Sequence, residues 1–136
     1  MNPLFNKKKT LIKSNEDTFA AVPMEITIQR MKDLLYTAFE GGSNYWIDHI
    51  EAKGKYKKSQ IEYIYDVPIL TKGWLEIHDI DDPTIIKLDS AALKKGLNIL
   101  AKLYPQAFSD FVNENEDAET ADVFLQCCCF GEVIYG

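Results

Sequence analysis

The sequence predicts an α+β fold: an N-terminal helix, an antiparallel sheet of about four strands, and two to three C-terminal helices packed on the sheet. Two observations predict it. Apolar residues recur at helical spacing before residue 41 and again after residue 89. Between these points, short segments alternate polar and apolar residues as strands do. Because strands and helices occupy separate stretches of the chain, we expect the helices to cover one face of the sheet.

Residues 26–40 are predicted to form the first helix of a single domain over residues 25–136. Thr27 can cap its N-terminus, because a threonine hydroxyl accepts a hydrogen bond from a backbone N–H of the first turn. Gly41 and Gly42 are expected to end it, since glycine adopts the left-handed conformation without a steric penalty. Residues 1–24 have no clear period and are predicted to be an N-terminal arm. The apolar face of the helix consists of Ile28, Met31, Leu34, Leu35, Ala38 and Phe39.

The middle of the chain is predicted to form an antiparallel meander, because polar turn segments separate its alternating runs. Pro68 suggests that one of these strands lies at an edge or ends there. The four predicted strands are residues 44–51, 61–70, 73–80 and 84–89.

Two or three helices are predicted after the sheet. One begins at Asp89 or Ser90 and ends before Pro105, and shorter helices follow at 106–114 and about 117–131. From 123 to 130 the last helix is apolar nearly all round, so it belongs in a core or in the interface of a homodimer. Its three consecutive cysteines, at 127–129, lack the spacing of a zinc site and are expected to be small buried residues in a reducing cytoplasm.

The composition narrows the classes of partner. The net charge is −6, so a basic surface for direct nucleic-acid binding is not expected, nor is binding to an anionic membrane. No apolar run reaches the roughly 18–20 residues that span a bilayer, and the first residues lack the apolar region of a signal peptide. The protein is therefore expected to be cytoplasmic.

The first candidate binding segment is "AFEGGSNYW", residues 38–46. A helix end followed by a strand start explains its glycines and aromatic residues. It explains Glu40 poorly, because a carboxylate in the last turn opposes the helix dipole. Asn44 is explained only as a turn residue. We therefore take Glu40, Asn44, Tyr45 and Trp46 as candidate contacts to a ligand or partner.

The second candidate segment is the C-terminal one, where Asp122, Gln126 and Glu132 are polar residues in or beside an apolar helix. Asp122 and Gln126 are four residues apart and share one helical face. Buried polar groups need hydrogen bonds, so these residues either satisfy backbone groups of a loop or line a polar pocket. We expect this segment to contact the "EGGSNYW" segment in the fold.

No catalytic constellation, cofactor or metal site is predicted. His49 and His78 lie in predicted strands, and neither is part of a metal-binding motif. A phosphate-binding loop is not expected either, because the two glycines follow a helix and do not precede one.

Residues 38–46 and 122–136 resemble the two characteristic segments of a family of small, mostly uncharacterised phage and prophage proteins. In that family a helix ends in A-[FL]-E-G-G-x-x-Y-W, and the chain ends in D-x-x-L-Q-x-x-x-F-G-E-x-x-Y-G. The cysteines fall at variable apolar positions of the second segment. The resemblance implies a cytoplasmic protein made during infection or from a prophage, and it carries over no catalytic residues.

These observations lead to a functional expectation with two alternatives. We expect a non-enzymatic accessory protein that binds a host factor or ligand in counter-defence, for example against CRISPR or a nucleotide-signalling system. The first alternative is a small protein that binds or cleaves a nucleotide, with Tyr45 or Trp46 stacking on a base and Glu40 or Glu132 as acid or base. The second is a structural domain that works only as an oligomer.

Overall fold

The computed structural model describes residues 17–20 and 22–136. Most of the predicted N-terminal arm lies outside these residues. Within the described part, five α-helices and three strands form an α+β fold, as the sequence predicts. The helices are α2 (Ile28–Thr37), α3 (Val67–Leu70), α4 (Ser90–Leu103), α5 (Pro105–Val112) and α6 (Ala118–Phe130). The strands are β1 (Ile47–Lys53), β2 (Trp74–Asp79) and β3 (Ile85–Leu88).

The strands form an antiparallel sheet in the order β1-β2-β3. The prediction of about four strands is wrong at residues 61–70, which form a 3₁₀ turn (Ile64–Asp66) followed by α3. The side chain of Asp66 accepts hydrogen bonds from the backbone N–H groups of Glu62 and Tyr63, which folds the segment back on itself. Pro68 then stands in the first turn of α3, where its missing N–H costs nothing.

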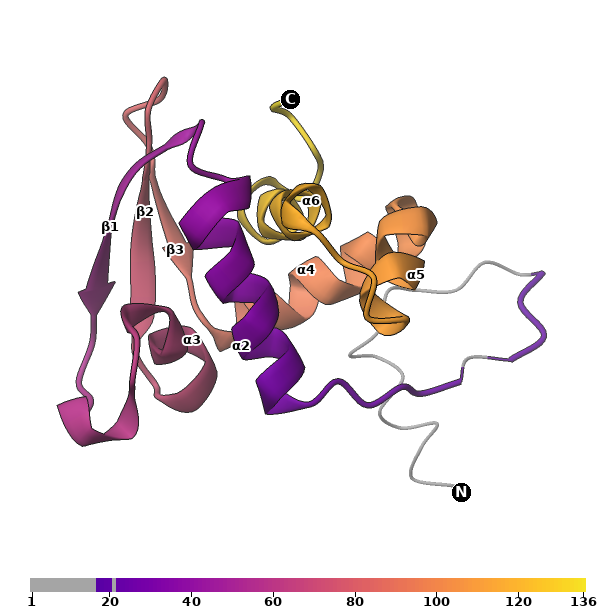
Figure 1. The fold of residues 1–136 in the computed structure, drawn as a ribbon, viewed down its shortest axis with the longest axis horizontal. Coiled ribbons are helices and arrows are strands. Elements are labelled where there is room, and N and C mark those ends of the chain that lie inside the picture. Colours follow the sequence, from indigo (N-terminus) through magenta and orange to yellow (C-terminus); the bar gives the residue numbers. More distant parts are fainter. Residues whose placement is uncertain (1–16, 21) are drawn as a thin grey trace.

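Helices α2, α4 and α6 lie on one side of the sheet (Figure 1). Side chains on β2 alternate accordingly: Leu75 and Ile77 are fully buried toward these helices, whereas Glu76 and His78 lie half-buried on the opposite face. Thr27 and Asp89 cap α2 and α4 through their side chains, as predicted.

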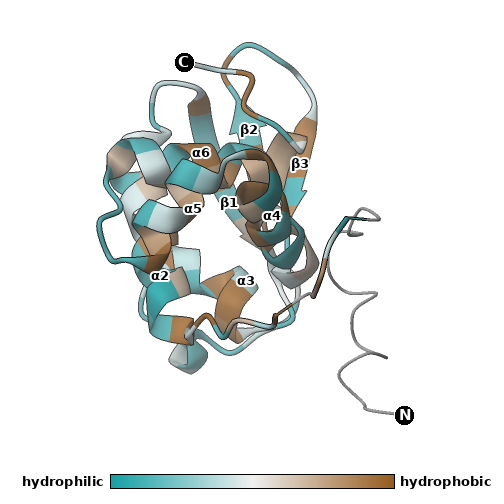
Figure 2. Ribbon diagram, turned by 90° about the vertical axis from the view of Figure 1, so that its right-hand side faces the viewer, coloured by the Kyte–Doolittle hydropathy of each residue, from teal (hydrophilic) through white to brown (hydrophobic). Residues whose placement is uncertain are grey.

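Helix α6 is buried by the chain itself, against α2, α4, α5 and β3. Figure 2 shows α6 among these elements, with the largely hydrophobic α3 beneath them. Phe124, Leu125 and Cys127 are fully buried. The apolar surface of α6 therefore has a partner within one chain and does not itself require a second copy. No helix in the described part of the chain is long and apolar enough to cross a membrane.

Glycines allow two close approaches to α6. Gly42 lies so close to the first turn of α6 that a Cβ there would stand 2.2 Å from the carbonyl oxygen of Ala118. Gly96 does the same for α4, where a Cβ would stand 2.2 Å from Cys128 Sγ. The expectation that Gly41 or Gly42 ends α2 in the left-handed conformation is wrong: neither has a positive φ. Instead, the helix widens into a π-helical turn over Ala38–Gly42.

This difference between two adjacent glycines can be tested. Gly42→Ala should lower the free energy of unfolding by about 1–3 kcal/mol, because the new methyl group must displace backbone. Gly41→Ala is the matched control: open space surrounds its Cβ position, so stability should stay within about 0.5 kcal/mol. Urea denaturation of both variants measures the difference. Equal stability of the two variants would contradict the close approach.

Candidate functional site

The two candidate segments meet at Asp122, whose buried carboxylate accepts four hydrogen bonds. Oδ1 accepts from the Ser43 hydroxyl and the Trp46 indole N–H, each at 2.8 Å. Oδ2 accepts from the Tyr45 hydroxyl at 2.6 Å and the Gln126 amide at 2.9 Å. All four donors are neutral, so the carboxylate is held by hydrogen bonds alone. The predicted contact between the segments is confirmed.

The Gln126 side chain joins the residues after α6 to the same cluster by hydrogen bonds. Its Oε1 accepts hydrogen bonds from the backbone N–H groups of Ile134 and Tyr135, both at 2.8 Å. The side chain is fully buried, so every polar atom it carries needs such a partner. Of the two roles that the sequence left open, satisfying loop backbone groups is the one this geometry supports.

Trp46 lies inside the core. It is 1% exposed, stacks on the ring of Tyr135 at 5.7 Å between centroids, and packs against Phe130 at 5.2 Å. The Tyr135 hydroxyl in turn donates a hydrogen bond of 2.7 Å to Asp79. Gly131, in the left-handed conformation at the end of α6, turns the chain so that these contacts form.

The structure thus brings together four of the seven candidate residues: Tyr45, Trp46, Asp122 and Gln126. Asn44 and Glu132 are exposed and lie outside the hydrogen bonds of this cluster. Glu40 is also exposed, and it accepts a hydrogen bond from the Tyr65 hydroxyl on another part of the surface.

That second surface is a tyrosine patch, which we define as Tyr36, Tyr63 and Tyr65. The rings of Tyr36 and Tyr63 are 43% and 46% exposed and meet edge to face at 5.4 Å. Tyr65 stacks on the buried ring of Phe39 at 5.0 Å, which ties the patch to the core. The patch borders a hollow of about 140 Å³ lined by Gln29, Lys32, Asp33, Tyr36, Glu62, Tyr63, Tyr65 and Asp66.

Tyrosine hydroxyls in the Asp122 cluster and in the tyrosine patch have raised pKa values. Burial and the hydrogen bond to Asp122 raise the pKa of Tyr45 to about 12. Burial and the bond to Glu40 do the same for Tyr65, whose pKa is about 12. The bond to Asp79 raises the pKa of Tyr135 to about 12. Burial also raises the pKa of all three cysteine thiols, so they stay protonated and unreactive at neutral pH.

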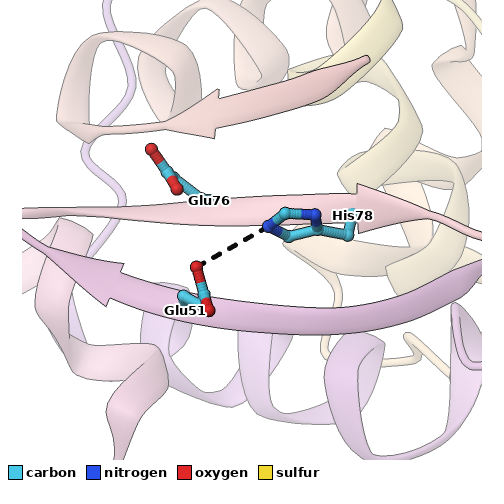
Figure 3. A group of neighbouring side chains, drawn as sticks. All are labelled: Glu51, Glu76 and His78. Atoms are coloured by element: carbon cyan, nitrogen blue, oxygen red, sulfur yellow. Dashed lines mark ion pairs between the residues drawn. The ribbon is translucent and has the colours of Figure 1, made fainter. Parts of the chain in front are cut away.

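A third group lies on the sheet face that turns away from the helices. Glu51 of β1 and Glu76 and His78 of β2 point to this side (Figure 3). One ligand atom from each lies within 4.8 Å of the others. This group was not predicted from the sequence, because each histidine taken by itself lacks a metal-binding motif. The signal was present as "HIE" at 49–51 and its mirror image "EIH" at 76–78.

Comparison of the chain with protein-family models, with curated proteins and with solved structures finds no match. Any proposal about function is therefore based on the sequence and on the geometry of the described residues.

Asp122 can be tested as the centre of the network. Asp122→Ala should lower the free energy of unfolding by about 3 kcal/mol or more, because it leaves buried donors without an acceptor at about 1–3 kcal/mol each. Glu132→Ala, an exposed carboxylate ten residues on, should change it by less than about 0.5 kcal/mol. Chemical denaturation measures both. An Asp122→Ala protein as stable as its parent would rule out the network as a stabilising element.

The raised pKa of Tyr135 predicts a pH dependence. The folded state favours the neutral hydroxyl. The stability that this hydroxyl contributes is therefore fully present below about pH 10 and is lost as the pH rises through about 12. Tyr135→Phe should therefore be less stable than the parent at pH 8, and the difference in the free energy of unfolding should shrink as the pH rises from 10 to 12. A difference that stays constant with pH would contradict the assignment.

Proposed function

We propose that the protein is a non-enzymatic phage or prophage accessory protein that acts in the host cytoplasm by binding a host protein in counter-defence. The phage context comes from the resemblance of residues 38–46 and 122–136. The choice of a protein partner comes from the tyrosine patch, which is the observation that carries this proposal.

The tyrosine patch has the properties of a protein-binding surface. Tyrosine is enriched at interfaces because it offers a large apolar ring and a polar tip with few rotatable bonds. Tyr36 stands on α2, and Tyr65 is held by Phe39 and Glu40, so little side-chain freedom is lost on binding. Rigid aromatic residues around a small depression are the usual form of an interface hot spot.

The size and charge of the hollow favour a side chain over a nucleotide. Its volume of about 140 Å³ is below the roughly 300–1,000 Å³ of small-molecule sites. Lys32 is the single cation in its lining, beside the carboxylates Asp33, Glu62 and Asp66. Carboxylates repel a phosphate, whereas a basic or polar side chain of a partner would suit them.

The nucleotide alternative finds less support in the geometry. Trp46 is 1% exposed, so a base could stack on it only if the core opened. A larger hollow of about 320 Å³ contains Arg30 with Glu25 and Glu114. The guanidinium of Arg30 is already bound by Glu116 and by the carbonyl of Phe111, which leaves it little capacity for a phosphate.

Affinity purification from infected cells tests the proposal. The tagged protein should retain a host protein, and Tyr36→Ala with Tyr63→Ala should lose it, with at least a tenfold drop in affinity for the purified partner, about 1.4 kcal/mol. Leu103→Ala on α4 is the control, because it removes an equally exposed apolar side chain elsewhere. Thermal melting checks that the variants fold. Retention of the partner by the double tyrosine variant would exclude the patch as its binding surface.

A further inference from the structure

The outer face of the sheet contains an inverted pair of tripeptides. "HIE" on β1 and "EIH" on β2 pair antiparallel, so His49 stands opposite His78 and Glu51 opposite Glu76. We propose that Glu51, Glu76 and His78 bind one divalent transition-metal ion, of which Zn²⁺ is the best fit. This site is independent of the tyrosine patch and of the function proposed for it.

The Nε2 atom of His78 is the first reason. It is shielded from solvent and has no hydrogen-bond partner among the described residues. A shielded polar atom without a hydrogen-bond partner destabilises the folded state. Its nearest charged neighbour is Glu51 Oε2, at 3.8 Å, which is too long for a hydrogen bond (Figure 3). A metal ion would give this nitrogen the partner that it lacks.

The opposed glutamates are the second reason. Like charges directly opposite each other on neighbouring strands are destabilising. Here the Lys53 ammonium lies between them, 3.6 Å from Glu51 and 3.9 Å from Glu76. Both distances are beyond hydrogen-bond length, and Lys87, which stands opposite Glu76 on β3, has its ammonium over the Trp74 ring. Among the described residues, neither glutamate is therefore hydrogen-bonded to an ammonium group. A divalent cation would neutralise both carboxylates and release Lys53 to solvent.

The geometry needs only a small adjustment to hold a metal. Zinc binds nitrogen and oxygen at about 2.0–2.2 Å, which places two ligands of a tetrahedral ion about 3.3 Å apart. The ligand atoms already lie within 4.8 Å of one another, and the side chain of Glu51 is 49% exposed and free to rotate. Three protein ligands leave coordination positions for water.

His49 has a positioning role. Its ring stacks on that of His78 with 4.0 Å between centroids, and its Nδ1 is fixed by Asp48 at 2.6 Å. The stack keeps the His78 ring in a plane that directs Nε2 toward Glu51. One imidazole and two carboxylates suit Zn²⁺ and its transition-metal neighbours better than Mg²⁺, which prefers an all-oxygen shell.

Calorimetric titration of the full chain with ZnCl₂ tests the site. We expect one ion per chain, with affinity reduced at least about tenfold by Glu51→Gln or His78→Gln. Lys53→Met should bind Zn²⁺ more tightly than the parent, because the competing ammonium is gone. Glu119→Gln, which changes an exposed carboxylate in the first turn of α6, outside the cluster, should bind as the parent does. Circular dichroism confirms that each variant is folded.

Co²⁺ provides a second readout that distinguishes these ligands from the cysteines. Binding at the cluster gives visible d–d bands without a thiolate-to-cobalt charge-transfer band. A thiolate band would place the metal on the cysteines and overturn the proposal. So would Zn²⁺ binding that survives Glu51→Gln and His78→Gln, or the absence of binding in both the parent and Lys53→Met.

Discussion

The carboxylate of Asp122 is the constraint on which the rest of this fold depends. A buried charge is tolerated only when its oxygens are fully hydrogen-bonded, and here both oxygens receive two donors each. Three of these donors come from the four residues after the π-helical turn, at Ser43, Tyr45 and Trp46. The turn must therefore lie against α6, and Gly42 is the residue that lets the two backbones approach.

From that contact the remaining C-terminal packing follows. Trp46, fixed through its indole N–H, presents its ring to Tyr135 and Phe130. Gln126, one turn further along α6, holds the backbone at Tyr135, and Tyr135 reaches Asp79 at the end of β2. Hydrogen bonds and ring contacts thus join residues 43–46, α6, residues 134–135 and the sheet. The two candidate segments, residues 38–46 and 122–136, are the two halves of this structural network.

Most of the fold could be predicted because it follows from local patterns. The N-caps of α2 and α4, the existence of α6 and three of the four predicted strands depend on spacing and capping residues that the sequence displays directly. The predicted apolar face of α2 is wrong at Ile28, which is 59% exposed because it stands in the first turn of the helix, while Met31, Leu34 and Leu35 are buried. The strand prediction for residues 61–70 was wrong. Their polar and apolar residues alternate as in a strand, but the Asp66 side chain accepts hydrogen bonds from two backbone N–H groups and closes a turn. In a sequence, the alternation of a strand is easier to recognise than one side chain that hydrogen-bonds to nearby backbone N–H groups and so competes with the strand.

The contact between the candidate segments could also be predicted, because Asp122 and Gln126 are polar residues in an apolar helix and had to find partners. The same reasoning could not locate Tyr36 beside Tyr63, or Glu51 beside Glu76. Those neighbours depend on how the loop after β1 returns to α2 and on the register between β1 and β2. A one-residue slip of that register would move every side chain of a strand to the other face.

The carboxylate of Asp122 and the carboxylates of Glu51 and Glu76 differ in how completely they and their neighbours are hydrogen-bonded. On the helix side of the sheet, one carboxylate has four short hydrogen bonds, so that site has no capacity left for a ligand. On the open side, the Lys53 ammonium lies 3.6 Å and 3.9 Å from two opposed glutamates, and a shielded imidazole nitrogen has no hydrogen-bond partner among the described residues. Polar residues are usual on the solvent face of an antiparallel sheet, but there the shielded His78 Nε2 remains without a hydrogen-bond partner among the described residues. A polar group kept at a cost is best explained by something outside the chain that it binds, and the mirrored tripeptides place three such groups within reach of one ion.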